Sequence, residues 1–229
     1  MDRSISSNGF FEAEPCFFDI LFSAEEGNQN DKHLFFFLNN SLKLISERLS
    51  FTFNAKLKTM VRNLIYNFDN EKSRLYSGIA EIAALCKILE AEELTLRDIE
   101  QKIPNGKSVD FVIGYNNEDF FIEVVSRSFD IGRINSEDGL YTFLRDHIEK
   151  KFNEKYQQLD ALYLRRASLL PVLWGDLYNL KQYWEALLRI DKAYRGPLFP
   201  FYCLFHAGEK GYVFVPANDV FQHAKEQEA

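Results

Sequence analysis

The amino-acid sequence predicts a mixed α/β protein in which helices cover a single β-sheet. Its 229 residues are 46% hydrophobic and 27% charged, a composition typical of a globular protein that buries a core of its own. Helix-like and strand-like hydrophobic patterns also alternate along the chain. Their order is helix, strand or strands, hairpin, helix, strand, helix and hairpin, which is the order expected of one sheet flanked by helices.

An aromatic-rich, mainly helical extension is predicted for residues 1–70. This segment contains 11 of the 22 phenylalanines in the chain. Its residues 24–32 are polar and predict a loop. Apolar residues at helical spacing then predict one helix over 34–49 and a second helix that has Asn54 as its N-cap and runs to Phe68.

A local excess of positive charge lies between residues 41 and 66, which hold five basic residues and one acid, Glu47. Either this is a solvated helix face, or it is a surface that contacts phosphate groups. The net charge of the whole chain is −7, which excludes a protein that binds nucleic acid through a generally basic surface. The basic residues of this segment are Lys43, Arg48, Lys56, Lys58 and Arg62.

The alternating pattern predicts an α/β domain over residues 71–229. A strong helix is expected over 73–92, a strand with a weaker signal over 94–103, and two β-runs over 108–114 and 119–126. A short connection with two asparagines at its tip joins these runs and predicts an antiparallel hairpin. Because both faces of the second run are apolar, it is expected to be a central strand that is covered on both sides.

Two more helices, a strand and a second hairpin are predicted to complete the domain. Ser136 is a suitable N-cap for a long helix over 138–163. Pro171 then opens a short apolar strand, because proline is tolerated at the first residue of a strand. The remaining elements are a helix over 176–190 and a hairpin that pairs Phe199–His206 with Tyr212–Val215.

Three carboxylates lie at positions that suggest chemistry. Asp110 is in the first strand of the predicted hairpin, Glu123 is in the middle of its apolar second strand, and Glu81 is in the preceding helix. A carboxylate buried in an apolar strand needs a cation, a proton or a firm hydrogen bond. Acids on two paired strands can share one divalent ion, and Mg²⁺ prefers one or two carboxylates together with water and phosphate oxygens.

This arrangement resembles the PD-(D/E)xK nuclease superfamily, whose restriction-endonuclease-like core has the order α-β-β-β-α-β. The matching residues are Glu81 on the first helix, Asp110 on the second core strand and Glu123 on the third, and the resemblance extends over residues 73–175. It implies a metal-dependent nuclease that hydrolyses phosphodiester bonds in nucleic acid, with DNA as the expected substrate. Asp110, Glu123 and Glu81 would then hold Mg²⁺ or Mn²⁺ at the scissile phosphate.

Two residues depart from the pattern of the superfamily. Val109 stands where the motif has proline, and Val125 stands where it has its catalytic lysine. Arg127 lies on the same side of the strand as Glu123 by alternation and can bring a positive charge close, although an arginine cannot act as a base. The helix that follows resembles the superfamily's helix with lysine and glutamine near the site. Its candidates for the missing charge are Lys155 and Lys151, with Gln158 beside them.

Two rival hypotheses stay open at this point. In the first, the chain is a catalytically inactive member of the same fold that binds nucleic acid or a protein partner. In the second, the resemblance to the nuclease superfamily is accidental and the chain is an α/β interaction protein. A homodimer is expected only by analogy with the superfamily. No membrane span or signal peptide is predicted, and Cys16, Cys86 and Cys203 are too widely spaced to suggest a disulfide framework, so a cytoplasmic protein is expected. No role is predicted for His147 or His206.

Overall fold

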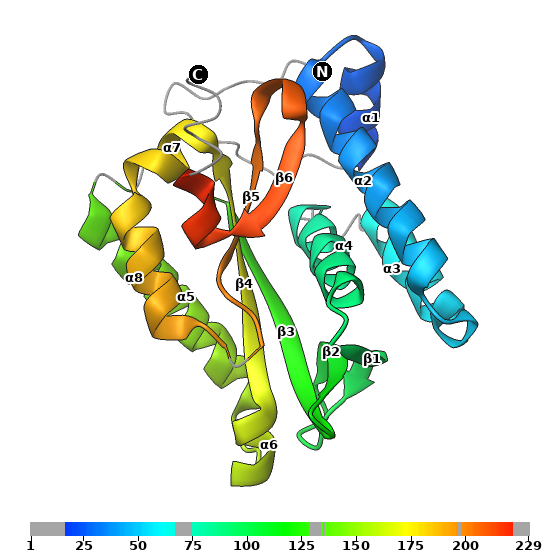
Figure 1. The fold of residues 1–229 in the computed structure, drawn as a ribbon, viewed down its shortest axis with the longest axis vertical. Coiled ribbons are helices and arrows are strands. Elements are labelled where there is room, and N and C mark those ends of the chain that lie inside the picture. The colour runs from blue at the N-terminus through cyan, green and yellow to red at the C-terminus, as the bar shows by residue number, and fades with distance from the viewer. Residues whose placement is uncertain (1–16, 67–74, 129–133, 135, 197, 222–229) are drawn as a thin grey trace.

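A six-stranded mixed sheet flanked by helices forms the architecture of the protein (Figure 1), which confirms the predicted α/β class. The computed structural model describes residues 17–66, 75–128, 134, 136–196 and 198–221. Among these residues, no helix is long and apolar enough to cross a membrane.

The strands follow one another across the sheet in their order along the chain, β1-β2-β3-β4-β5-β6. They are β1 (Thr95–Lys102), β2 (Ser108–Tyr115), β3 (Glu118–Ser128), β4 (Ala167–Asp176), β5 (Tyr202–His206) and β6 (Tyr212–Pro216). The first three strands form an antiparallel meander, β3, β4 and β5 are parallel to one another, and β6 turns back antiparallel. Helices cross over between the parallel strands, as such pairings require.

The helices form one layer on each face of the sheet (Figure 1). They are α1 (Phe17–Glu25), α2 (Gln29–Arg48), α3 (Asn54–Tyr66), α4 (Leu75–Glu90), α5 (Glu137–Tyr156), α6 (Ala161–Arg166), α7 (Leu177–Gln182) and α8 (Trp184–Tyr194). Single turns of 3₁₀ helix lie at Phe51–Phe53, Gly208–Lys210 and Ala217–Asp219. Helices α1 to α4 share a core with one face of the sheet, and α5, α7 and α8 share a second core with the other face.

Strand β3 is central, as predicted, because it lies between β2 and β4 and contributes to both cores. Ile122 is buried on the α4 side, and Val125 is buried on the α5 side. The hairpin that leads into β3 turns at Asn116 and Asn117, whose φ angles of 49° and 64° are left-handed. A two-residue hairpin turn of this kind needs positive φ at both positions, and asparagine tolerates it well.

The N-terminal predictions were wrong in two details. The polar stretch 24–32 is largely helical, since α1 extends to Glu25 and α2 begins at Gln29. The Asn28 side chain caps α2 by accepting hydrogen bonds from the backbone N–H groups of the second and third residues that follow it. Asn54 is not an N-cap, because its backbone is already helical at the end of the preceding 3₁₀ turn.

Both long helices predicted for the C-terminal half are divided in two. The helix predicted over 138–163 ends at Tyr156, and Gln158 has a left-handed φ of 67° before Asp160 caps α6. The helix predicted over 176–190 is interrupted at Tyr183, between α7 and α8.

Pro171 does not open its strand but lies in the middle of β4, between Ala167 and Asp176. It pairs with Val125 on one side, while the pairing of β4 with β5 begins only at Val172. At Pro171 the strand is therefore paired on one side only. A missing backbone N–H is tolerated there for the same reason as on an edge strand.

Candidate active site

Two of the three candidate carboxylates, Asp110 and Glu123, lie where strands β2 and β3 separate. Their ladder ends at the pair Phe111 and Ile122, so that Asp110 and Glu123 come next in register without being paired. Beyond this point β3 continues alongside β4. Asp110 Oδ2 accepts a hydrogen bond of 2.7 Å from the backbone N–H of Val124, and its carboxylate thereby satisfies a donor of β3 that the β2 backbone no longer reaches.

The environment of these carboxylates opposes their negative charge. Burial raises the pKa of Asp110 well above its usual value, and the nearby charges of Glu81 and Glu123 raise it further, against the hydrogen bond from Val124. Burial also raises the pKa of Glu123, although Lys155 and a hydrogen bond from Asp110 act in the opposite direction. The charge of Glu81, on α4, therefore acts on the same site.

Lys155 of α5 is the cation that contacts these acids. Its Nζ lies 2.6 Å from Glu123 Oε2, and the two side chains are only 20% and 14% exposed. The same Nζ donates a hydrogen bond of 2.6 Å to the backbone carbonyl of Ser108, at the start of β2. Oε2 is buried and receives no well-directed hydrogen bond from the described residues. The contact is thus an ion pair whose carboxylate oxygen still has hydrogen-bonding capacity.

The last turn of α5 is fastened on two sides, which fixes Lys155. Asn105, between β1 and β2, donates to the backbone carbonyls of Lys155 and Gln157 at 2.9 and 3.1 Å. The hydroxyl of Tyr156 is shared between the carbonyls of Phe121 on β3 and Ser168 on β4, at 2.9 and 3.0 Å. These bonds hold the end of the helix against the strand that carries Glu123.

Val125, at the position of the motif lysine, carries no charge. Its side chain is only 5% exposed and packs in the core beneath α5. Arg127 does not take its place beside Glu123. Its Nε donates a hydrogen bond of 3.0 Å to His147 Nδ1 on α5, and its side chain is exposed at the end of β3.

The other two candidates on the helix side lie further from the acids. Lys151 lies 3.8 Å from Glu154, and among the causes that shift the pKa of Glu123 its charge is the smallest. Gln158 lies beyond the end of the helix.

Sequence reasoning missed two histidine contacts. His147 contacts Arg127, and His33 Nδ1 lies 2.7 Å from His206 Nε2, which joins α2 to β5. In each case the partners are on different elements, far apart in the sequence. The only available signal was that His147 shares a helical face with Lys151 and Lys155 at four-residue spacing.

The acidic side chains fit a hydrated Mg²⁺ better than an ion held by protein ligands alone. Among the described residues, no group of three or more His, Cys, Asp and Glu side chains is arranged to hold a metal ion. Mg²⁺ keeps several waters and needs only one or two carboxylates. Asp110 and Glu123 meet that need, because their carboxylates lie within hydrogen-bonding reach of each other.

Two members of the N-terminal basic cluster have structural contacts. An Arg48 guanidinium nitrogen donates to the carbonyl of Leu89 at 3.0 Å, which ties α2 to α4. Lys56 forms an ion pair with Asp98 on β1 and donates to the carbonyl of Ile99 at 2.7 Å. For these two residues, packing of the N-terminal helices accounts for the positive charge without a phosphate ligand.

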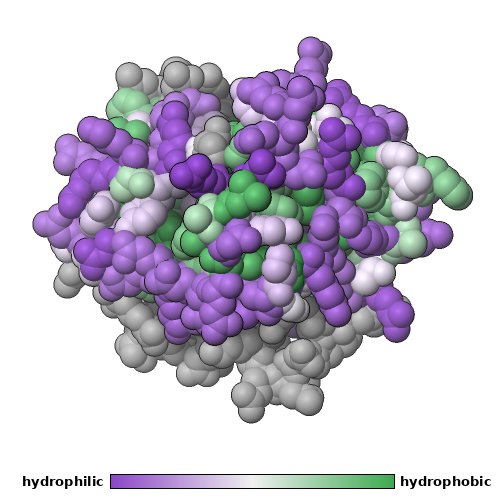
Figure 2. Space-filling model, turned by 90° about the horizontal axis from the view of Figure 1, so that it is seen from below, coloured by the Kyte–Doolittle hydropathy of each residue, from purple (hydrophilic) through white to green (hydrophobic). Residues whose placement is uncertain are grey.

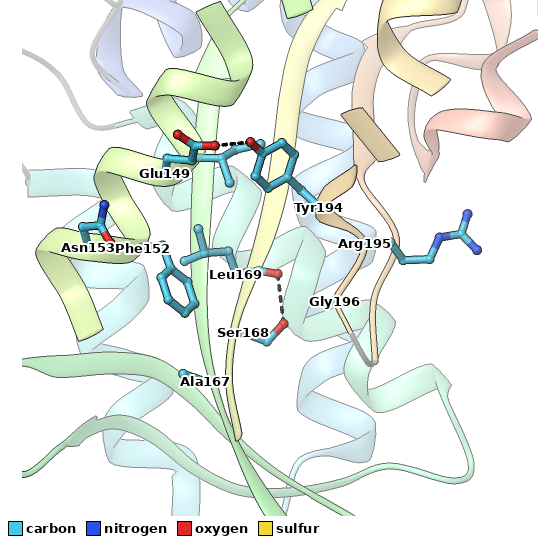
Figure 3. A pocket seen from close by; sticks show the side chains of 10 residues that line it. Glu149, Phe152, Asn153, Ala167, Ser168, Leu169, Tyr194, Arg195 and Gly196 are labelled. Carbon is cyan, nitrogen blue, oxygen red and sulfur yellow. Dashed lines mark hydrogen bonds between the residues drawn. The ribbon is translucent and has the colours of Figure 1, made fainter. Parts of the chain in front are cut away.

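A cavity of about 480 Å³ lies on another face of α5, between that helix, the start of β4 and the segment that follows α8 (Figure 3). Phe152 and Leu169 form part of its apolar lining, Glu149 and Tyr194 are hydrogen-bonded at its rim, and Arg195 points away from it. None of the candidate site residues lines this cavity. It is therefore separate from the carboxylate site.

The end of the molecule that lies lowest in Figure 1 carries an apolar area framed by hydrophilic residues (Figure 2). Helix α6 lies at this end, and its side chains Leu162 and Leu164 are 57% and 39% exposed. Exposed apolar residues in a contiguous area are common at protein interfaces.

Comparisons of this chain with protein-family models, with curated proteins and with solved structures returned no significant match. The functional argument therefore rests on the local geometry and on the order of the secondary-structure elements.

Proposed function

We propose that this protein is a metal-dependent nuclease with a restriction-endonuclease-like core, and that it hydrolyses phosphodiester bonds in nucleic acid, with DNA as the first candidate. One observation carries the proposal. Two carboxylates, Asp110 and Glu123, meet where two strands separate, and the Lys155 ammonium lies 2.6 Å from one of them. The element order α4-β1-β2-β3-α5-α6-β4 supports it, because apart from the short helix α6 this is the α-β-β-β-α-β order of the PD-(D/E)xK superfamily.

Each side chain has a defined part in the proposed reaction. A bound Mg²⁺ or Mn²⁺ would activate a water molecule and neutralise charge at the scissile phosphate. Asp110 and Glu123 would hold the ion, and Glu81 would add negative charge that favours it. Lys155 replaces the missing motif lysine, so that its ammonium orients the attacking water and stabilises the negative charge that develops on the phosphate.

The alternative is an inactive member of the same fold that binds nucleic acid or a protein. The ion pair between Lys155 and Glu123 favours it, because it compensates the glutamate charge without a metal ion. Val125 at the motif lysine position favours it as well. A homodimer remains part of the proposal by analogy, with the exposed α6 leucines as the first contacts to examine.

Cleavage of a nucleic-acid panel separates the two hypotheses. The panel contains single- and double-stranded DNA and RNA, each with Mg²⁺, Mn²⁺ or EDTA. We expect metal-dependent cleavage that Asp110→Asn and Glu123→Gln both abolish. The matched control is Asp119→Asn, which removes a carboxylate of β3 that is 55% exposed and lies 3.7 Å from Arg97. Cleavage that survives in the two site variants would contradict the proposed site, and its absence from well-folded wild type would favour the inactive alternative.

A further inference from the structure

The cavity of about 480 Å³ beside α5 has the size and the lining of a small-molecule site. Pockets that bind small organic ligands enclose about 300–1,000 Å³ and combine an apolar wall with a few polar groups. Ile148 and Phe152 of α5 and Leu169 of β4 supply the apolar wall. Ala167 also lines the cavity, and its small side chain leaves the space open.

Polar side chains lie at the two ends of this wall. Glu149 and Tyr194 are at one end and Ser168 is at the other, with Phe152 and Leu169 between them (Figure 3). A molecule that fills the cavity would therefore meet a carboxylate and a phenol at one end and a hydroxyl at the other.

Glu149 places a negative charge at its end of the cavity. The Tyr194 hydroxyl donates a hydrogen bond to Glu149 Oε1. Burial, together with this hydrogen bond and the charge of Glu149, raises the pKa of Tyr194, so the phenol stays protonated and Glu149 is the charged partner. The second oxygen of Glu149 has no hydrogen-bond partner among the described residues, and it can accept hydrogen bonds from a ligand.

The two arginines nearest in the sequence to these residues bind other carboxylates. Hydrogen bonding to Asp146, at 2.9 and 2.6 Å, is the main cause of the raised pKa of Arg145, and the charge of Glu149 adds to it only to a lesser degree. Arg195 pairs with Asp191 and points away from the cavity (Figure 3). The Glu149 end therefore favours a positively charged ligand group and disfavours a negative one.

The Ser168 end is sheltered and can accept a hydrogen bond. Ser168 is only 3% exposed, and the main chain passes close to it, because a Cβ atom on Gly196 would lie 2.3 Å from Ser168 Oγ. The hydroxyl donates to the Leu169 carbonyl at 3.2 Å, which leaves its lone pairs able to accept an N–H group. This end suits the ring N–H of an aromatic heterocycle.

We infer that the cavity binds a small aromatic amine, whose ring lies between Phe152 and Leu169 and whose ammonium group pairs with Glu149. A ring N–H group would reach Ser168. This inference goes beyond the proposed nuclease function and does not depend on it, because the cavity is lined by none of Asp110, Glu123 and Lys155.

Calorimetric titration of the full chain with tryptamine tests the inference, because tryptamine joins an indole ring to an ammonium group. The comparison probes are tryptophol, which has a hydroxyl in place of the ammonium, and indole-3-acetate, which has a carboxylate. Tryptamine is expected to bind roughly tenfold more tightly than tryptophol, as for one charge-assisted hydrogen bond, and indole-3-acetate is expected to bind most weakly. Glu149→Gln should remove the preference for tryptamine and leave tryptophol binding unchanged, since the amide oxygen still accepts from Tyr194.

Glu154→Gln is the matched control, because it removes another exposed carboxylate of α5 that pairs with Lys150 and Lys151 and does not line the cavity. It should bind tryptamine as wild type does. A crystal structure of the complex is expected to show the ring between Phe152 and Leu169. The inference would be overturned by tryptamine that fails to bind up to about 1 mM, that binds no more tightly than tryptophol, that keeps its preference in Glu149→Gln, or that lies elsewhere in the complex.

Discussion

Asp110 and Glu123 are acids whose surroundings disfavour their charged forms. Burial raises the pKa of each, and the charges of Glu81 and Glu123 add to the effect at Asp110. The backbone N–H of Val124 and the ammonium of Lys155 act against this effect. A divalent ion would relieve this repulsion. Without the ion, the charged carboxylates are expected to lower the free energy of unfolding at neutral pH.

Asp110→Asn is therefore expected to raise the melting temperature of the metal-free protein at pH 7 to 8 by a few degrees. The folded-state pKa of Asp110 lies above the unfolded value of about 4. Its stabilising, protonated form is then fully present below that value and is lost as pH rises through the higher folded-state value. The advantage of the variant should accordingly vanish toward pH 4. Thermal melts in EDTA from pH 4 to 8 check this, and a variant less stable than wild type at pH 8 would contradict it.

Lys155→Met is expected to destabilise the metal-free protein by about 1–3 kcal/mol, because it leaves the mostly buried Glu123 carboxylate without its cation. The double variant with Glu123→Gln should recover most of this loss, since no charge is then left unpaired. Urea denaturation of the two singles and the double measures the coupling. The matched control is the Lys56–Asp98 pair, whose side chains are 40% and 30% exposed and for which a smaller coupling is expected. Equal coupling in the two pairs would contradict this account of Lys155.

At the scale of elements, helix α5 matters because its last turn carries Lys155. Tyr156 follows directly in the chain, is fully buried, and bonds through its hydroxyl to β3 and β4. Asn105 satisfies the carbonyls at the end of the helix from the other side. The position of the ammonium is thus fixed by contacts with β3, β4 and the connection between β1 and β2.

Tyr156→Phe is expected to cost about 1–3 kcal/mol of stability, because the carbonyl groups of Phe121 and Ser168 lose their shared donor. It should also lower kcat of the proposed cleavage more than it raises KM, since Lys155 would lose part of its support. Chemical denaturation and steady-state kinetics measure the two effects. Tyr178→Phe serves as control, because Tyr178 is 76% exposed. An unchanged kcat in a destabilised Tyr156→Phe protein would show that the hydroxyl serves the fold alone.

Local patterns predicted many of the elements but not the breaks between them. The hairpin from β2 to β3 follows from two asparagines between apolar runs, and helix α4 follows from its apolar stripe. The division of the helix predicted over 138–163 could not be read in the same way. Its break at Gln158 involves neither glycine nor proline, and the helix end is hydrogen-bonded by Asn105, which lies 50 residues before Lys155 in the sequence.

The same limit applies to the candidate site. The sequence shows an acid within an apolar strand, and register then places Asp110 opposite Glu123. The choice among Lys155, Lys151 and Arg127 depended on how α5 lies against β3, which no local pattern specifies. The contact between His147 and Arg127 was missed for the same reason.

At the scale of the whole molecule, the candidate site draws on both helical layers. Glu81 comes from α4, which shares its core with α1, α2 and α3, and Lys155 comes from α5 on the opposite face of the sheet. Both charges act on Asp110 where β2 and β3 separate, and Glu81 raises its pKa while Lys155 lowers it. Contacts such as His33 with His206 and Arg48 with Leu89 join the N-terminal helices to the sheet and to α4.

Calorimetric titration of the metal-free protein with Mn²⁺ tests the central claim most directly, because it does not require knowledge of the substrate. We expect wild type to bind the ion at this site with an affinity that rises with pH, since the ion and protons compete for the same raised-pKa carboxyl groups. Asp110→Asn and Glu123→Gln should each lose this binding, and Asp119→Asn should keep it. Equal Mn²⁺ binding by wild type and both site variants, or no binding by any of them, would contradict the claim that Asp110 and Glu123 form a metal site.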